Sequence, residues 1–285
     1  MHEMKSWLRK LRPIEVGFLF CLFTSGPSAA QIVPDTTLPA NSLVTEQGNT
    51  SLIEGGTTKG SNLFHSFEQF SVSTGGTAYF NNTVDIQNII SRVTGRSVSN
   101  IDGLLQANGA ANLFLLNPNG IVFGPNATLN VGGSFLASTA SSLKFADGKE
   151  FSSTTAQDPP LLTVSVPIGL QFGSNPGAIR VQGAGHVLAI PSFFSPISGA
   201  GASSSGLRVL PGKTLALVGN GVDLDGGILT APGGRIELGS VSSGVVDLNP
   251  TSTGWALGYR NVQNFQDIAL SQRALVDAIA PLNRF

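Results

Sequence analysis

The chain has 285 residues, of which only 12% are charged, and its formal net charge is −1 at pH 7. No basic stripe of Lys and Arg runs through it, which argues against a nucleic-acid-binding protein. The 35 Gly and 16 Pro residues accompany short apolar segments, so the length fits one large β domain or two small ones.

The first 30 residues have the three-part pattern of an export signal. A basic segment precedes an apolar stretch at residues 16–23, and small residues follow at 28–30. The apolar stretch is too short for a membrane anchor, which takes roughly 20 apolar residues. We therefore predict a signal peptide at residues 1–30, cleaved after Ala30. The only cysteine, Cys21, lies inside it, so the mature chain would contain no disulfide.

A run at residues 161–172 alternates between apolar and polar side chains, as a half-buried β-strand does. The apolar set is Leu162, Val164, Val166, Ile168, Leu170 and Phe172, and the polar set is Thr163, Ser165 and Gln171. The pattern predicts that the apolar set is buried and that the polar set faces outward. Pro167 would lie on the outward face, where its missing N–H predicts a bend or an edge position.

From residue 207 onward, the apolar segments become short and evenly spaced. LRV, LALV, VDL, ILT and RIEL begin about six to eight residues apart, with Gly, Asn and Pro between them. Three such strands make a unit of about 20 to 25 residues, the size of one solenoid coil. A β-sandwich also has short strands, but its strands are usually longer and its hairpins richer in Asn-Gly and Asp-Gly. The spacing favours the solenoid.

The C-terminal segment, residues 266–280, allows two interpretations. Residues 266–280 contain enough alanine and aliphatic residues for a helix, yet the segments IAL and LV continue the coil spacing. The spacing favours two strands. The chain then stops where another strand would follow, so we expect a truncated gene product or a fragment whose remainder is encoded elsewhere.

The densest local signal is the turn Asn117-Pro118-Asn119-Gly120, followed by Ile121, between two apolar segments. The first Asn side chain can accept bonds from backbone N–H groups ahead of it, and Pro presets φ at the second position. Asn and Gly tolerate the remaining angles. Taken alone, this turn is a structural feature.

The residues around this turn resemble a known family. The chain from about residue 31 to 150 is similar to the haemagglutination-activity domain of filamentous haemagglutinins and related two-partner-secretion exoproteins. The matching features are the Arg92-Val93-Thr94-Gly95 turn, Ser99 to Gly103, Asn108-Gly109-Ala110 and Asn117 to Ile121, extended by residues 60–72, 80–82 and 131–139. Residues 73–77 stand where the family carries an upstream NPNL-type turn, so that turn's role is not transferred.

The resemblance implies an all-β fold: a right-handed parallel β-helix with an N-terminal cap and extra-helical strands. Residues 31–150 would be the secretion domain and residues 151–285 continuing coils. It also implies export from a Gram-negative-type bacterium, through the periplasm and an outer-membrane β-barrel transporter whose periplasmic domains recognise the N-terminal part. Exposed strand edges of the early coils would serve that recognition by strand addition.

In this interpretation residues 117–121 are the predicted site and act through folding and display of the edge. The chain would be the secretion module of an adhesin-type exoprotein, with ligands on host or neighbouring cells as further partners. We expect no catalytic activity, cofactor or metal.

Two other functional classes stay open, namely a β-helical carbohydrate-active enzyme and a carbohydrate or haem-carrier binding protein. Such an enzyme needs clustered carboxylates. The chain offers only Asp223 and Asp225 on one strand face, with Arg235 and Glu237 in a neighbouring strand. They could form a small charged cluster on the outer wall, but the favoured interpretation is a solvated ion pair.

The histidines and phenylalanines have structural interpretations. His65 and His186 have no Cys or second His at metal-ligand spacing, so both are predicted to be hydrogen-bonded structural residues. The predicted core or capping cluster contains Phe64, Phe67, Phe70 and Phe80. No motif for a nucleophile or a phosphate loop is present.

Overall fold

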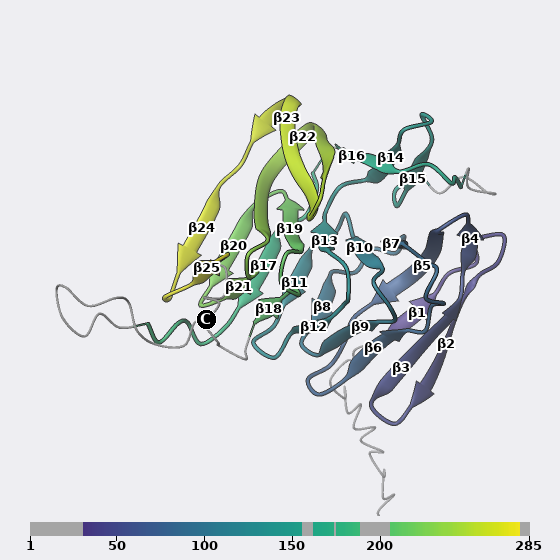
Figure 1. Ribbon diagram of the computed structural model, residues 1–285, viewed down its shortest axis with the longest axis horizontal. Helices are drawn as coiled ribbons and strands as arrows, with labels where there is room; N and C mark the ends of the chain where they lie inside the picture. The colour runs from purple at the N-terminus through teal and green to yellow at the C-terminus, as the bar shows by residue number, and fades with distance from the viewer. Residues whose placement is uncertain (1–30, 156–161, 174, 189–205, 280–285) are drawn as a thin grey trace, which may run out of the picture.

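The computed structural model describes residues 31–155, 162–173, 175–188 and 206–279 (Figure 1). The predicted signal peptide and its cleavage site lie outside these residues. The described ranges consist of strands, turns and loops, and they contain no helix with the length and hydropathy of a membrane span.

Three stacks of parallel strands form the walls of a β-helix (Figure 1). Wall A contains β5 (Asn62–Phe70), β7 (Asn88–Val93), β10 (Asn112–Leu116), β13 (Phe135–Ser138), β19 (Thr214–Gly219) and the first part of β22 (Arg235–Thr251). Wall B contains β8 (Ser99–Ile101), β11 (Ile121–Phe123), β17 (Ile179–Gln182), β20 (Val222–Asp225) and β24 (Ile268–Ser271). Wall C contains β3 (Thr50–Gly55), β6 (Thr77–Phe80), β9 (Leu104–Ala107) and β12 (Thr128–Asn130), followed by the sheet of β18 (Leu207–Arg208), β21 (Ile228–Thr230) and β25 (Leu275–Asp277).

The interior of the β-helix is filled by rows of apolar side chains from successive coils. One row on wall A runs through Leu63, Ile89, Leu113, Phe135 and Leu215, which pair in parallel register and are all buried. Stacking identical positions buries each side chain between the coils above and below. The predicted parallel β-helix and its inward rows are therefore confirmed, as are the short strands after residue 207.

A second, antiparallel sheet covers the outer face of wall A (Figure 1). It contains β14 (Ser142–Phe145), β15 (Glu150–Ser152), β16 (Pro167–Phe172), the second part of β22 and β23 (Gly254–Phe265). Between the two sheets lies a second core, in which the rings of Phe114 and Trp255 are 4.6 Å apart. These are the predicted extra-helical strands.

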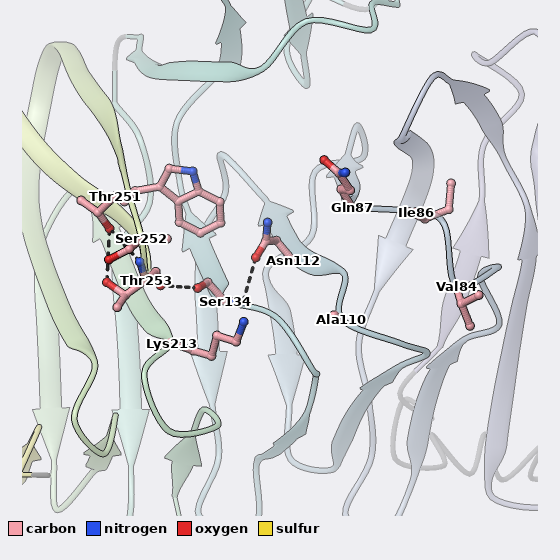
Figure 2. Close-up of a pocket in the computed structure, with 12 residues that line it drawn as sticks. Val84, Ile86, Gln87, Ala110, Asn112, Ser134, Lys213, Thr251, Ser252 and Thr253 are labelled. Atoms are coloured by element: carbon pink, nitrogen blue, oxygen red, sulfur yellow. Dashed lines mark hydrogen bonds between the residues drawn. The ribbon is translucent and has the colours of Figure 1, made fainter.

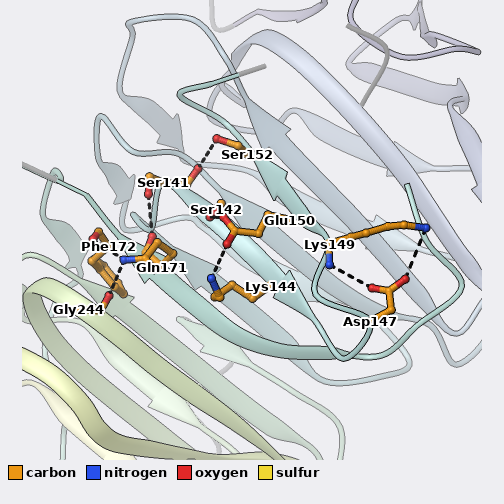
Figure 3. Close-up of polar contacts among 10 residues, drawn as sticks. All are labelled: Ser141, Ser142, Lys144, Asp147, Lys149, Glu150, Ser152, Gln171, Phe172 and Gly244. Carbon is orange, nitrogen blue, oxygen red and sulfur yellow. Dashed lines mark hydrogen bonds and ion pairs between the residues drawn. The ribbon is translucent and has the colours of Figure 1, made fainter. Parts of the chain in front are cut away.

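The solvent face of this extra-helical sheet is held by polar contacts (Figure 3). Lys144 on β14 forms an ion pair with Glu150 on β15, and the Ser142 hydroxyl donates to the same carboxylate at 2.9 Å. The Gln171 amide donates to the Gly244 carbonyl at 3.2 Å. One face of the extra-helical sheet is therefore apolar and packs against wall A, and the other face is polar and points toward solvent.

The N-terminal end of the β-helix is closed by antiparallel strands. β1 (Ile32–Pro34) pairs with the second half of β5, and β4 (Thr57–Lys59) pairs with the first half. On wall C, β2 (Ser42–Gln47) pairs with β3 across a two-residue turn. This is the predicted N-terminal cap.

The prediction for residues 161–172 is wrong in its first half. β16 begins only at Pro167; Val164, Val166 and Ile168 are 69%, 54% and 40% exposed, and Thr163 is buried. The bend before Pro167 is held by the Asn62 amide, which donates to the carbonyls of Thr163 and Ser165 at 3.1 and 2.9 Å, and by the Thr163 hydroxyl, which accepts from the Ser165 N–H at 3.0 Å. Pro167 is itself buried, and its strand is paired on both sides by β14 and β22. Leu161 lies outside the described residues.

The tail up to residue 279 forms two strands. β24 pairs in parallel with β20, and β25 pairs in parallel with β21. The strands are separated from the previous coil by the β22–β23 hairpin, after which the chain returns to the same register. The prediction of strands at residues 266–280 is thus confirmed for the described part.

Candidate functional site

The turn at residues 117–121 forms a corner between wall A and wall B. Asn117 follows β10 directly and is fully buried. Its Oδ1 accepts from the Asn119 backbone N–H at 3.0 Å, as the turn mechanism predicts. Its Nδ2 donates to the Ser97 carbonyl and the Ser99 hydroxyl, both at 2.9 Å. The side chain thereby links this corner to the preceding coil.

The rest of the turn contacts the following coil. The Pro118 carbonyl accepts from the Gly177 N–H at 2.7 Å, and the Ile121 N–H donates to the Ala178 carbonyl at 3.1 Å. Gly120 has φ = +123°, a conformation that other residues rarely adopt. Because the turn is bonded on both sides and largely buried, it shapes the corner and presents few free groups.

A polar groove of about 640 Å³ lies beside this corner. Its walls are residues 34–36 of the cap and residues 94–97, and Glu68 and Gln69 complete it. The Asn119 amide donates to the Gly95 carbonyl at 2.8 Å. The corner at residues 117–121 therefore supports one wall of the groove.

The early strand edges differ from the expectation. β5, the first strand of wall A, has no free edge, because β1 and β4 cover it. In the described part of the chain, the outermost strand of wall C is β2, which pairs only with β3. Leu43 on β2 is 62% exposed. The edge available at this end therefore belongs to a cap strand and not to a coil.

A ladder of asparagines connects the first coils on wall A. The Asn88 amide donates to Asn62 Oδ1, and the Asn112 amide donates to Asn88 Oδ1, both at 2.9 Å. Asn112 Oδ1 accepts from the Ser134 N–H at 2.9 Å, and the Ser134 hydroxyl donates to the Thr253 carbonyl at 2.9 Å (Figure 2). Our sequence analysis missed this ladder, although the recurrence of Asn at one-coil intervals was a usable signal.

The ladder ends at a second groove, of about 350 Å³, where the tip of the β22–β23 hairpin meets the coils (Figure 2). Lys213, Ser252 and Thr253 line it beside Asn112 and Ser134. The Thr214 hydroxyl also donates to the Thr253 carbonyl at 2.9 Å. The hairpin tip is therefore anchored on the strand starts of wall A.

The predicted solvated ion pair is present, but the four charged residues do not gather into one cluster. Arg235 and Glu237 form an ion pair of 3.1 Å with each other on β22. Asp223 and Asp225 lie on β20, which belongs to wall B, and the Asp225 carboxylate accepts from the Ser271 hydroxyl at 3.1 Å. The two pairs are separated because β20 and β22 are strands of different walls. The described residues contain no group of three His, Cys, Asp or Glu arranged to hold a metal ion.

The two histidines are structural, as predicted. His65 is 1% exposed, its Nδ1 lies 2.9 Å from the Ser42 hydroxyl, and its ring packs against Phe67 and Phe80. Burial lowers the pKa of His65 to about 3, so the ring is neutral at ordinary pH. His186 Nδ1 accepts from the Leu188 N–H at 3.1 Å.

The four phenylalanines belong to two cores. The rings of Phe67 and Phe70 lie 5.2 Å apart, and those of Phe70 and Phe80 lie 6.1 Å apart, inside the β-helix. Phe64 points to the other face of β5, where its ring is 5.1 Å from that of Phe151. The predicted burial is confirmed, but a single cluster is wrong, because Phe64 and Phe67 are three positions apart in β5 and so face opposite sides. A bulge at Glu68, where the register with β1 shifts, puts Phe70 on the same side as Phe67.

The family model of the TPS secretion domain matches residues 30–283. The chain belongs to this family. It is a two-partner secretion module, as the resemblance in its sequence implied, and such domains belong to secreted exoproteins.

Two solved structures are similar to the chain. The HMW1 secretion domain from Haemophilus influenzae has 18% identity and a TM-score of 0.46, covering 87% of this chain and 52% of that one. A filamentous hemagglutinin secretion domain has 17% identity and a TM-score of 0.42, covering 87% of this chain and 96% of that one. The chain thus spans about half the length of the HMW1 chain. No curated protein matched it by sequence.

Proposed function

We propose that the transporter recognises this secretion module at its N-terminal cap. In this proposal a strand of the transporter pairs with the outer edge of β2. The partner is an outer-membrane β-barrel transporter with periplasmic domains, in a Gram-negative-type bacterium. Residues 31–150 form the recognised domain, residues 151–285 continue the coils, and the module has no catalytic role. Ligands on host or neighbouring cells are its proposed further partners.

The observation that carries this proposal is the unpaired outer edge of β2. Gln47 and Thr50 flank a two-residue turn, so they form a hydrogen-bonded pair, and such pairs alternate along the hairpin. The backbone N–H and C=O groups of Val44 and Glu46 consequently point away from β3. These groups are the donors and acceptors that an added strand would use.

The corner at residues 117–121 supports this role indirectly. It bonds residues 95–99 of the preceding coil and residues 177–178 of the following one, so it fixes the stacking on which the cap is built. Its members are mostly buried, which leaves few groups for direct contact with a partner. We assign the corner to assembly and the β2 edge to recognition.

The test is Glu46→Pro in the full chain, produced in cells that carry the transporter. Proline removes an outward N–H and no backbone hydrogen bond to β3, so the purified variant should keep the wild-type circular dichroism. The bonds from the Ser51 hydroxyl to the Glu46 carboxylate, at 2.8 and 3.0 Å, are lost in this variant and equally in an alanine variant. We expect the amount of protein in the medium to fall roughly tenfold, as for the loss of about 1.4 kcal/mol of binding. Glu46→Ala, which keeps the N–H, is the matched control and should be secreted normally. Wild-type secretion of folded Glu46→Pro would refute edge recognition.

A further inference from the structure

Arg92 is a buried cation on the outer face of wall A. The sequence places it in a turn, but it is the penultimate residue of β7, and the turn begins after Val93. It is 1% exposed, and its register partners in adjacent coils are Ser66 and Leu116. None of the ion pairs in the described ranges includes Arg92. A guanidinium in such a place needs neutral acceptors for its N–H groups.

Those acceptors come from three separate parts of the chain. Nε donates to the Ser66 hydroxyl at 2.8 Å, and Nη2 donates to the Thr37 hydroxyl at 2.7 Å. Nη1 donates to the Ser152 carbonyl, and the guanidinium carbon lies 4.2 Å from the centre of the Phe151 ring. Arg92 therefore touches the N-terminal cap, β5 and the extra-helical strand β15 at once.

Asp35 completes the cap side of this network. Its carboxylate accepts from the Ser66 and Thr94 hydroxyls, both at 2.6 Å, and from the Thr37 hydroxyl at 2.8 Å. Ser66 and Thr37 each accept from Arg92 and donate to Asp35, so two hydroxyls join the opposite charges. Burial raises the pKa of Asp35, but these hydrogen bonds outweigh it and hold the pKa below its ordinary value.

We propose that Arg92 is a latch that couples docking of the first segment of the cap, residues 31–37, to docking of the β14–β15 hairpin. Whichever segment docks first fixes the long Arg92 side chain in one rotamer. The second segment then meets a donor that is already ordered, so its own docking is more favourable.

The latch also makes tight docking of residues 31–37 depend on a later part of the chain, which goes beyond the proposed function. Thr37 precedes Arg92 by 55 residues and Ser152 follows it by 60, so the network is complete only after the chain has folded through Ser152. Until then β1 is held weakly on β5, and the edge of β5 at Phe67 and Phe70 stays open to another strand.

The test is amide hydrogen exchange on the purified chain, without a transporter, so it is independent of the secretion assay above. Phe151→Leu keeps an apolar side chain in the second core but removes the aromatic face from the guanidinium. In the wild-type background we expect exchange at residues 32–37 to rise roughly fivefold. In the Arg92→Met background the same substitution should change exchange there by less than about twofold.

The matched control is Glu150→Gln, which removes the ion pair with Lys144 on the outer face of the same hairpin (Figure 3) and touches no Arg92 contact. It should leave exchange at residues 32–37 unchanged. If Arg92→Met does not fold, Arg92→Lys replaces it, since one ammonium cannot span the three acceptors. Equal acceleration by Phe151→Leu in both backgrounds, or none in the wild type, would overturn the latch.

Discussion

Replacing Asn117 with alanine should destabilise the β-helix by about 3 kcal/mol. The side chain makes four hydrogen bonds, two as donor to the Ser97 carbonyl and Ser99 hydroxyl and two as acceptor from Asn119. A net contribution of about 0.5–1.5 kcal/mol per bond gives roughly 2–6 kcal/mol. We take a value in the lower half of this range, because Asn119 is half-buried and water can partly replace the two bonds that it donates, whereas the bonds to Ser97 and Ser99 lie beneath the corner.

Thermal and urea unfolding of the purified chain measure this loss, which corresponds to a fall in Tm of about 6–12 °C for a domain of this size. Asn117→Asp tests the donor bonds separately from the acceptor bonds. It keeps an oxygen that accepts from Asn119, but it places a negative charge against the Ser97 carbonyl. It should be at least as destabilising as alanine. Asn126→Ala is the control, because its amide bonds only to the Asp102 carboxylate at an exposed turn, and it should cost less than about 1 kcal/mol. An Asn117→Ala chain as stable as the control would refute the reasoning.

Three further predictions concern other parts of the fold. The pKa of His65 is about 3 in the folded chain and 6.5 in the unfolded chain, so on acidification the unfolded chain takes up the proton first. The free energy of unfolding, measured with urea, should therefore fall by about 1.4 kcal/mol for each unit that the pH is lowered from 6 to 4, and His65→Gln should remove this dependence. Trp255→Ala should cost about 3–5 kcal/mol and accelerate amide exchange in β22 and β23. Gly177→Ala sets a Cβ about 2.3 Å from the Asn119 backbone and should lower Tm, whereas Gly173→Ala, with 3.4 Å of room, should not.

The features that could be predicted from the sequence are those determined within one coil or between neighbouring coils. The Asx geometry at Asn117 follows from four consecutive residues, and the strands after residue 207 follow from spacing repeated over one or two coils. In a solenoid each coil contacts mainly its neighbours, so a short stretch of sequence contains most of the information that determines it. The tail strands β24 and β25 were predictable for the same reason.

The features that could not be predicted depend on contacts with the extra-helical sheet or with the cap strands. The bend before Pro167 is held partly by Asn62, which lies about a hundred residues earlier, so the alternation of apolar and polar residues within the segment does not predict it. Phe64 is buried only because Phe151 and its hairpin cover the outer face of β5. The covered edge of β5 likewise depends on β1 and β4, whose few residues give no distinctive pattern.

The corner between walls A and B explains how the β-helix accommodates these extra-helical strands. In one coil the corner is the four-residue turn at 117–120, whereas in the next it expands into residues 139–178, which carry β14, β15 and β16. The chain must re-enter wall B in register after this excursion. The Pro118 carbonyl accepts from the Gly177 N–H, and on the other side the Asn220 amide donates to the Pro176 carbonyl at 2.8 Å. The short corners at Asn117 and Asn220 thus bond to residues 176 and 177, where the long corner rejoins wall B. The inserted strands can therefore add a second core without shifting the coils.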